Sequence, residues 1–432
     1  MIGEADPLKI LIKNVYALLP DGTTPLTNIM VENERIRSVG EVPANFKAER
    51  VIDGKDHFAV PGFVNAHTHA SMTLLRSYAD DMVLMDWLNN KIWPVEDKMG
   101  KEDLYWGAML AAAEMIRTGT TAFADLYGPY MEEVAKATLE SGLRGILSRG
   151  LIGVAPGSDK KLEEGVALYK EYHGAGNGRL TVMLAPHAPY TCPPEYLKKV
   201  AKAAEECQAE IHIHMSETKG EVENCLKEYG QRPFALVEST GLFEHGTMAA
   251  HCVHVDDEDI EIIKKHHIRV IHNPGSNMKL ASGVAPVPRF LSEGICVALG
   301  TDGASSNNNL DMLEEVQLAA LLHKVDSFDP LSVPALEAVK MGTEYGARAV
   351  GLKEAGRLEA GAMADIVLFD LNNVMWCPRH NLVSLLAYSA RSSTVDTVMV
   401  AGKVLMESRE LKTLDEERII FEAQRCADRL TK

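Results

Sequence analysis

The hydrophobic pattern at the two ends of the chain differs from the pattern in its middle. From about residue 8 to about residue 60, short stretches of alternating apolar residues are separated by Asp-Gly and Gly turns, which is typical of β-strands and hairpins. The same pattern returns after about residue 357, and a short helical pattern follows at 416–430. Because each flank is too small to bury a strong core, we predict that residues 1–60 and 357–432 form one composite β-sandwich domain.

Between the flanks, short apolar stretches alternate with longer amphipathic helical patterns such as KEDLYWGAMLAAAEMIRTG and PPEYLKKVAKAAEECQ. Eight strands with helical crossovers predict an α/β protein whose residues 61–356 fold as a TIM-like (β/α)₈ barrel. A doubly wound open sheet is the alternative, but no Gly-rich phosphate loop occurs. The eight candidate strands are AVPGFVNAHTH, TTAFADLY, RGILSRGL, LTVMLAPHAP, EIHIHMSE, TMAAHCVHV, RVIHNPGSN and ICVALGTDG.

Composition narrows the possible partners. The 432 residues are 46% hydrophobic and 24% charged, as in ordinary globular proteins, and the formal net charge is −17. Such an acidic chain is a poor match for nucleic acid or for an anionic membrane surface. Seven scattered cysteines without CxxC spacing, no apolar run of ~18 residues and no signal-peptide pattern at the start indicate a soluble cytoplasmic protein.

Polar residues gather where the predicted strands end. In a (β/α)₈ barrel the loops at that end converge over the barrel mouth, where active sites are built. We therefore expect these residues to lie close together. They are His67, His69, Asp125, Arg149, His187, His214, Glu217, His251, Asn273 and Asp302.

The clearest of these signals is the pair His67 and His69, which forms an HxH on the first barrel strand. Alternation along a strand points both imidazoles to one face, so that they can bind the same metal ion. His214 would add a third nitrogen and Asp302 a carboxylate oxygen, a ligand set that suits Zn²⁺ and is also used by Fe²⁺. His212 alternates onto the same face as His214 but lies deeper, and we expect it to pack in the core or to support a ligand.

Several segments together resemble a known family. PGFVNAHTHASM, HMSET, AHCVH and GTDGASSNNNLDM look like the amidohydrolase superfamily, in its branch of purine and triazine deaminases, and the flanking LEAGAMADIVLFD resembles the composite domain of that branch. Within the branch, LMDWLNNKIWPVE, APHAPYT and NPGSNMKLASG are similar to the 5′-methylthioadenosine/S-adenosylhomocysteine deaminases. The resemblance covers essentially the whole chain.

The resemblance implies hydrolytic deamination of an adenine ring at C6. Superfamily members with two metal ions carry a carboxylated lysine at the end of the fourth strand, whereas here that strand ends in APHAP, so one divalent ion is expected. The ion lowers the pKa of bound water from ~16 towards ~7. Asp302 can then accept the proton of the water, and the resemblance assigns His251 to orient the nucleophile.

Glu217 is the expected proton donor to the ring and then to the leaving ammonia. It lies three residues after His214 in a spacing that matches the family motif. General acid–base catalysis of this kind contributes ~10²–10⁴ in rate. The alternative is an ordinary carboxylate in the first turn of the helix that begins in MSETKGEVE.

Substrate selection would come from residues outside the metal site. The resemblance implies that Glu96 accepts hydrogen bonds from the ribose hydroxyls, that His187 faces the substrate, and that Trp87, with Trp93, forms an apolar wall. Arg149 would pair with a carboxylate such as that of a homocysteine tail. Trp87 as a core residue and Arg149 as a structural ion pair are the alternatives.

The resemblance also limits which substrates, assemblies and alternative functions are expected. A small-molecule nucleoside substrate and a homo-oligomeric assembly are expected. A guanine or other aminopurine deaminase, or a triazine chlorohydrolase, would use similar metal chemistry, but these act on rings without the ribose that Glu96 would bind. A non-catalytic scaffold protein would have lost the metal ligands, and here His67, His69, His214 and Asp302 are all present.

Overall fold

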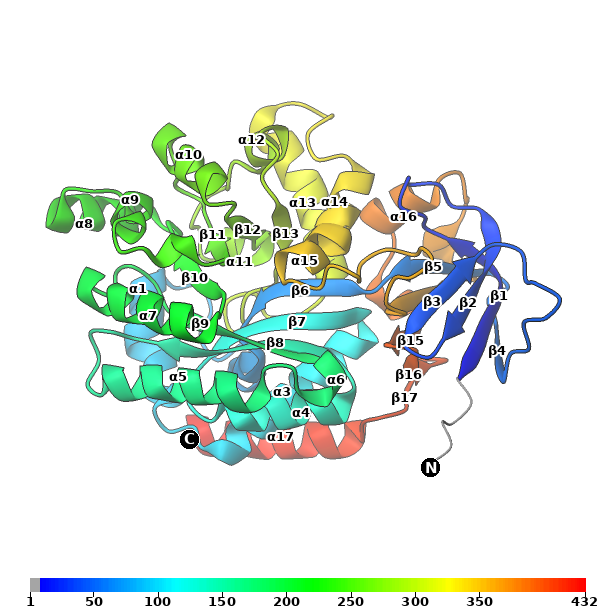
Figure 1. Cartoon of the computed structure of the whole chain (residues 1–432), viewed down its shortest axis with the longest axis horizontal. Helices are drawn as coiled ribbons and strands as arrows, with labels where there is room; N and C mark the ends of the chain where they lie inside the picture. The colour runs from blue at the N-terminus through cyan, green and yellow to red at the C-terminus, as the bar shows by residue number, and fades with distance from the viewer. Residues whose placement is uncertain (1–7) are drawn as a thin grey trace.

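The computed structural model describes residues 8–432, and it consists of a barrel flanked on one side by a sheet (Figure 1). The start of the chain, where no signal peptide is expected, includes residues 1–7, and these lie outside the described residues. The α/β class and the two kinds of architecture predicted from the hydrophobic pattern are confirmed.

Eight parallel strands form the barrel in sequence order, β6 to β13. Each of the eight apolar stretches predicted from the sequence contains one of them. Every residue of β7 and β8 is buried, as expected for strands covered by helices outside and by side chains within. The strands are Phe63–Thr68, Thr120–Tyr127, Arg144–Leu151, Leu180–Pro186, Ile211–Met215, Thr247–His251, Arg269–His272 and Val297–Leu299.

The barrel closes where its last strand returns to its first. The backbone N–H of Asp302 donates to the carbonyl of His67 at 3.0 Å, and Oγ1 of Thr68 donates to the carbonyl of Asp302 at 2.9 Å. The Nδ2 of Asn65 donates to Oγ1 of Thr301 at 2.7 Å. Two metal-ligand candidates from opposite ends of the chain are thereby brought into direct contact.

Helices follow the strands, and the amphipathic stretches identified in the sequence form α3, α7 and α13. The segment after β6 consists of short pieces, including a 3₁₀ helix at Ala70–Leu75 and a π-helix at Leu88–Ile92. The barrel helices are α1 Leu84–Trp87, α2 Trp93–Glu96, α3 Lys101–Arg117, α4 Met131–Ser141, α5 Ser158–Tyr172, α6 Ala175–Gly178, α7 Pro194–Cys207, α8 Lys219–Tyr229, α9 Pro233–Glu238, α10 Asp257–Lys265, α11 Pro274–Lys279, α12 Val287–Ser292, α13 Met312–Ser327, α14 Ala335–Gly342 and α15 Glu344–Ala349.

The two chain ends meet in one mixed sheet of nine strands, in the order β17-β16-β15-β14-β5-β1-β2-β3 with β4 beside β1. Its central seam is the antiparallel pair β5 and β14, which joins the N-terminal to the C-terminal half. Only Gly62 separates β5 from the barrel strand β6. The strands are Lys9–Ala17, Leu26–Glu32, Arg35–Val39, Arg50–Asp53, His57–Pro61, Ile366–Asp370, Val395–Val400, Lys403–Glu407 and Glu410–Leu411.

Two further helices follow β14, α16 at Leu382–Tyr388 and α17 at Glu416–Thr431. The last one runs along α3 of the barrel, to which it is tied by the ion pairs Arg117–Glu416 and Arg429–Asp103 (Figure 1). The division of the chain into domains at residues 60 and 357 stays a prediction. Among the described helices, we find none with both the length and the hydropathy to cross a bilayer.

Candidate active site

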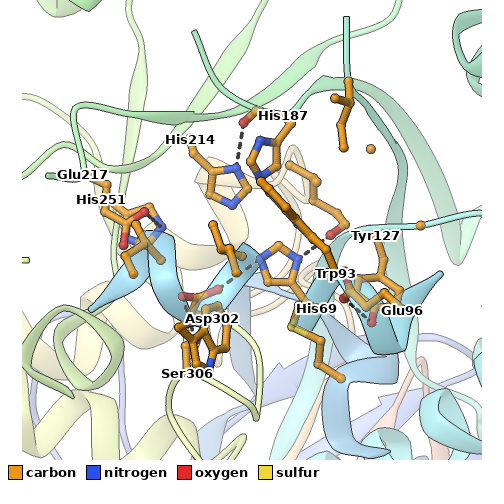
Figure 2. Close-up of a pocket in the computed structure, with 18 of the residues that line it drawn as sticks. His69, Trp93, Glu96, Tyr127, His187, His214, Glu217, His251, Asp302 and Ser306 are labelled. Carbon is orange, nitrogen blue, oxygen red and sulfur yellow. Dashed lines mark hydrogen bonds and ion pairs between the residues drawn. The ribbon is translucent and has the colours of Figure 1, made fainter. Parts of the chain in front are cut away.

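A cavity of about 800 Å³, including its open mouth, lies over the ends of the barrel strands. It is lined by nine of the ten residues that sequence reasoning assigned to the site or its catalysis, and the tenth, His67, is fully buried directly beneath it. In Figure 2, Glu217 and His251 lie on one side of His69, His214 and Asp302, and Trp93, Glu96 and Tyr127 lie on the other. The nine are His69, Trp87, Glu96, Arg149, His187, His214, Glu217, His251 and Asp302.

Candidate ligand atoms converge in two overlapping groups that share His67. The ligand atoms of His67, His69 and Asp302 lie within 4.8 Å of one another, as do those of His67, His214 and His251. Nε2 of His69 is 3.1 Å and Nε2 of His67 is 3.5 Å from Oδ1 of Asp302. The HxH strand and the two distant candidates are therefore brought together as predicted, with His251 also within reach.

Hydrogen bonds on the far side of each ring decide which nitrogen is left for a metal. Nδ1 of His214 donates to the carbonyl of His187 at 2.7 Å, and Nδ1 of His69 donates to the carbonyl of Leu126. In the neutral ring a donating Nδ1 leaves a lone pair on Nε2, which is the ligand form of histidine. Both Nε2 atoms face the cluster.

His67 provides the test of whether these residues fit a metal ion. Its Nδ1 shares a hydrogen bond of 2.8 Å with Nε2 of the fully buried His212, so the sequence expectation that His212 supports the site agrees with the geometry. Its own Nε2 is buried and has no hydrogen-bond partner among the described residues. Burial lowers the pKa of His67 to about 4, so the ring is neutral. A buried, neutral, unpartnered imidazole nitrogen beside a carboxylate fits a cation ligand.

Asp302 is held by α11, which follows β12, and by the loop after β13. Its Oδ2 accepts hydrogen bonds from Oγ of Ser276 at 2.6 Å and Oγ of Ser306 at 2.9 Å, and its Oδ1 accepts from the backbone N–H of Gly303 at 2.8 Å. Burial opposes ionisation, but His67 and His69 outweigh it and hold the pKa of Asp302 well below its usual value. The carboxylate is thus fixed in its charged form with Oδ1 towards the histidines.

Glu217 and His251 face each other across the cavity floor. Oε2 of Glu217 is 3.7 Å from Nε2 of His251, and Oε1 of Glu217 accepts a hydrogen bond from Oγ of Ser282 at 3.2 Å. Nδ1 of His251 contacts Oδ1 of Asn277 at 2.9 Å, which makes Nδ1 the donor and leaves Nε2 as an acceptor. Burial raises the pKa of Glu217 although His251 opposes the shift. A carboxyl group with a raised pKa is suited to donate a proton.

The loop that carries Glu217 is braced by a second buried acid. Ser216, which follows β10, has a φ of 49°, and Thr218 caps α8 by accepting a hydrogen bond from the N–H of Glu221. The side chain of Glu221 folds back and accepts hydrogen bonds from the backbone N–H groups of Ser216 at 3.2 Å and Glu217 at 2.8 Å. Glu217 is therefore no ordinary solvated carboxylate of a first helical turn, since it is 6% exposed.

On the opposite side of the cavity, Glu96 ends α2 and is held by Tyr127. The phenol of Tyr127 donates to Oε1 of Glu96 at 2.6 Å, which leaves Oε2 free of that contact (Figure 2). Burial raises the pKa of Glu96, and the Tyr127 hydrogen bond opposes the shift. Trp93 lies beside this pair at the cavity wall.

The remaining predicted residues each have a structural partner. Trp87 is 5% exposed, and its Nε1 donates to the carbonyl of Ala79 at 3.0 Å, so it is both a packed residue and part of the cavity wall. Nδ1 of His187 contacts Oγ1 of Thr191 at 2.9 Å, and burial lowers the pKa of His187 to about 4.

Arg149 forms an ion pair with Glu164 on α5, with 3.0 Å between Nε and Oε2. The sequence suggested a structural ion pair with Asp125 or another acid as the alternative role for Arg149, and Glu164 is that other acid. Asp125 instead accepts a hydrogen bond from the N–H of Ala70 at 3.1 Å. Arg149 nevertheless lines the cavity, so the ion pair and a contact with substrate are compatible.

Sequence reasoning missed several side chains that hold the others in place. Tyr127 is the last residue of a predicted strand, so the strand-end signal could have identified it. The others lie on the short helix α11 or in loops, within segments that carry the family resemblance, but the hydrophobic pattern gave no signal for their roles. They are Ser276, Asn277, Ser282 and Ser306.

Comparison with known proteins now adds to this geometry. The profile of the amidohydrolase family matches residues 58–405, about four fifths of the chain. The chain belongs to the amidohydrolase family. This amidohydrolase is 53% identical over 427 residues to a 5-methylthioadenosine/S-adenosylhomocysteine deaminase of Pelotomaculum thermopropionicum, with 98% of each chain covered.

Solved structures resemble the amidohydrolase over nearly its whole length. An adenosine deaminase of Xanthomonas campestris with bound zinc is 32% identical, with a TM-score of 0.93 and 99% of each chain covered. An atrazine chlorohydrolase of Arthrobacter aurescens in complex with zinc has a TM-score of 0.90 at 24% identity, covering 97% of this chain and 100% of its own. At that identity the second likeness shows the fold alone.

Proposed function

We propose that this amidohydrolase deaminates 5′-substituted adenosines by hydrolysis. The substrates are 5′-methylthioadenosine and S-adenosylhomocysteine, with 5′-deoxyadenosine and adenosine as further candidates, and the products are the inosine analogue and ammonia. The observation that carries the proposal is one cavity lined by a histidine–aspartate cluster, by Glu217 and by Glu96. The 53% identity to a deaminase of the same class over the full length supports it.

The cluster fits one divalent cation, with His67, His69, His214 and Asp302 as the proposed ligands. Zn²⁺ is the proposed ion because three imidazoles and a carboxylate suit it and because the adenosine deaminase of similar structure binds zinc. When bound, such an ion acts as a Lewis acid that makes a water molecule acidic enough to provide a nucleophile near neutral pH.

Protons are moved by the residues of the cavity floor. Asp302 is the proposed acceptor for the proton of the attacking water, and His251, whose Nε2 is free to accept a hydrogen bond, orients that water. Glu217 donates a proton to the ring nitrogen N1 so that negative charge does not build up on the adenine. When the intermediate collapses, the Glu217 carboxylate takes the remaining hydroxyl proton and passes it to the leaving amine, and the proton held by Asp302 then restores the protonated Glu217. Its burial favours the protonated starting form that this step requires.

Recognition of the nucleoside is assigned to the opposite side. Oε2 of Glu96 accepts hydrogen bonds from the ribose hydroxyls while Tyr127 holds Oε1. Trp87 and Trp93 provide apolar walls, His187 faces the purine–ribose region, and Arg149 faces the 5′ substituent. Glu96 is the residue that separates this function from that of a guanine deaminase or triazine chlorohydrolase.

The proposal includes the setting in which the enzyme works. All seven cysteines are free, which fits the reducing cytoplasm. We propose a homo-oligomer, which size-exclusion chromatography with light scattering will test.

A substrate panel tests the function directly. The protein loaded with Zn²⁺ is given 5′-methylthioadenosine, S-adenosylhomocysteine, 5′-deoxyadenosine, adenosine, guanine and a chlorotriazine, and ammonia or chloride release is measured together with the loss of adenine absorbance. We expect turnover of the 5′-substituted adenosines. Turnover of guanine or the triazine alone would contradict the proposal.

A further inference from the structure

The guanidinium of Arg149 at the cavity wall is already partly engaged. Its Nε donates to Oε2 of Glu164 at 3.0 Å, and its Nη1 donates to the carbonyl of Gly150 at 2.8 Å. Its Nη2 has no hydrogen-bond partner in the described part of the chain. The Arg149 side chain is 10% exposed and that of Glu164 is 41% exposed, so the pair spans from the cavity to the solvent.

These contacts bear on how Arg149 can bind an acid. A guanidinium binds a carboxylate best through two parallel N–H groups on one edge, either Nε with Nη2 or Nη1 with Nη2. Glu164 occupies Nε and so one position of the first edge, and the Gly150 carbonyl takes one of the two N–H groups of Nη1. A ligand carboxylate must therefore bind through the remaining N–H groups of Nη1 and Nη2, with the negative charge of Glu164 beside them.

A neutral ligand tail meets no such obstacle. The cavity that Arg149 lines is also lined by Trp87, Leu88 and Ile152, whose apolar surfaces suit a thioether or a methyl group. An uncharged tail is not repelled by the Arg149–Glu164 pair, whereas a carboxylate tail must displace Glu164 or bind next to its negative charge.

We propose that Glu164 is a specificity-determining residue, which holds Arg149 so that adenosines with a neutral 5′ substituent are preferred over those whose 5′ substituent ends in a carboxylate. The proposal rests on the proposed deaminase function and deepens it by stating the class of 5′ substituent that the site favours. Glu164 acts through Arg149, so it is a positioning residue rather than a catalytic one.

The test compares two substrates on two variants. Glu164→Gln keeps the shape of the side chain and removes its charge, and Glu163→Gln is the matched control because Glu163 is the exposed neighbour on the same helix. kcat/KM is measured for S-adenosylhomocysteine and for 5′-methylthioadenosine. A charge-assisted hydrogen bond contributes about ten-fold or more when buried, and the partial exposure of Glu164 reduces that figure. We expect the ratio of kcat/KM for S-adenosylhomocysteine to kcat/KM for 5′-methylthioadenosine to rise at least about fivefold in Glu164→Gln. In Glu163→Gln this ratio should stay at the wild-type value.

Each outcome decides the matter. An unchanged ratio in Glu164→Gln would overturn the proposal. A lower ratio would also overturn it, because it would mean that Glu164 binds the ammonium group of the homocysteine tail. A rise that persists in the double variant Glu164→Gln/Arg149→Met would also overturn it, because the effect must pass through Arg149. If Glu164→Gln does not fold, Glu164→Asp, which retracts the carboxylate by one methylene, should raise the same ratio. Failure of the deaminase function itself would be seen separately, as absent turnover of both substrates by the wild-type protein.

Discussion

The two sides of the cavity are built differently. On the cluster side, His69 and Asp302 follow barrel strands and His214 lies within β10, and each is fixed by at least one hydrogen bond with another part of the chain. On the substrate side, Trp87 and Glu96 belong to the short helices after β6, and Arg149 pairs with the half-exposed Glu164. The cluster side is thus braced by the barrel, whereas the substrate side depends on single contacts to neighbouring segments.

The difference separates the residues that carry out the reaction from the residues that select the substrate. Metal binding and proton transfer need atoms held within fractions of an ångström, which strand ends and their hydrogen-bonded loops supply. The choice among adenosines needs a surface that can differ between relatives without disturbing the barrel, and short helices and ion pairs supply that. Substitutions on the cluster side should therefore affect turnover itself, and those on the substrate side should affect which nucleoside is turned over.

The largest effect is expected at the metal site. His67→Asn removes a ligand nitrogen that the structure leaves unpartnered. We expect loss of bound metal and a fall in kcat of at least ~10³-fold, because the ion supplies several kcal/mol of transition-state stabilisation. Elemental analysis and kinetics measure both. Chelation should inactivate the wild-type protein, and added Zn²⁺ should restore it but not the variant.

The control for that variant is His267→Asn, which changes an exposed histidine whose φ of 52° an asparagine tolerates. Full metal content in His67→Asn would remove this residue from the ligand set.

The next largest effect on kcat is expected at Glu217. This residue takes part in the proposed reaction on the cluster side but is not a proposed metal ligand. Glu217→Gln should retain the metal and lose at least ~10² in kcat, the usual scale for removal of a general acid. Glu223→Gln is the control, since Glu223 is exposed on the following helix α8 and pairs with Lys219. Normal turnover in Glu217→Gln would show that the proton comes from elsewhere.

The substrate side should respond through KM. Tyr127→Phe removes the hydrogen bond to Oε1 of Glu96, a contact that holds a buried carboxylate. We expect KM for 5′-methylthioadenosine to rise about tenfold with little change in kcat, since a hydrogen bond to a charged group contributes roughly 1.5–3 kcal/mol. The effect should vanish for a 2′,3′-dideoxy analogue. Tyr130→Phe, three residues further on at an exposed position, serves as the control.

The smallest effect concerns stability rather than turnover. Glu315 on α13 accepts hydrogen bonds from the N–H of Gly275 at 3.0 Å and from Nδ2 of Asn307 at 2.7 Å, and it ties together the loops that hold Asp302. Burial raises its pKa from 4.5 to about 8. Below pH 4.5 both the folded and the unfolded chain hold the proton. As the pH rises to about 8, only the unfolded chain releases it, so stability falls.

The fall amounts to as much as about 1.4 kcal/mol per pH unit while the two states differ by one proton. Glu315→Gln should therefore show a thermal midpoint that declines less between pH 5 and 8 than that of the wild type. A decline identical to that of the wild type would mean that Glu315 is ionised in the folded protein.

The same two sides differ in how far the sequence could predict them. The eight barrel strands and the cluster were predictable because buried strands appear as short apolar runs and because an HxH at a strand end has a direct geometric meaning. His67 and His69 needed no knowledge of the tertiary fold. Glu217 and His251 were identified with the help of the family resemblance, and their mutual distance of 3.7 Å was not foreseen.

The bracing residues could not be predicted in this way. Ser276 on the short helix α11 and Ser306 in the loop after β13 contact Asp302 through conformations that no local periodicity determines. Tyr127 stands at a predicted strand end, but its contact with Glu96 on α2 depends on the tertiary fold. The segment after β6 forms short helices, including a π-helical turn, that the hydrophobic pattern did not indicate. The pairing of Arg149 with Glu164 depends on how α5 packs on β8, which the sequence pattern alone does not specify.

The seam between β5 and β14 has a consequence for how the protein is made on the ribosome. The two strands are about 300 residues apart in the chain, and at roughly 5–20 residues per second they emerge about 15–60 seconds apart. During that interval β5 lacks its neighbour, and β6, which carries His67 and His69, continues directly from it. The nascent chain must therefore keep an apolar strand edge from aggregating until β14, about six sevenths of the way along the chain, has been synthesised. A chain truncated before β14 would leave that edge exposed permanently.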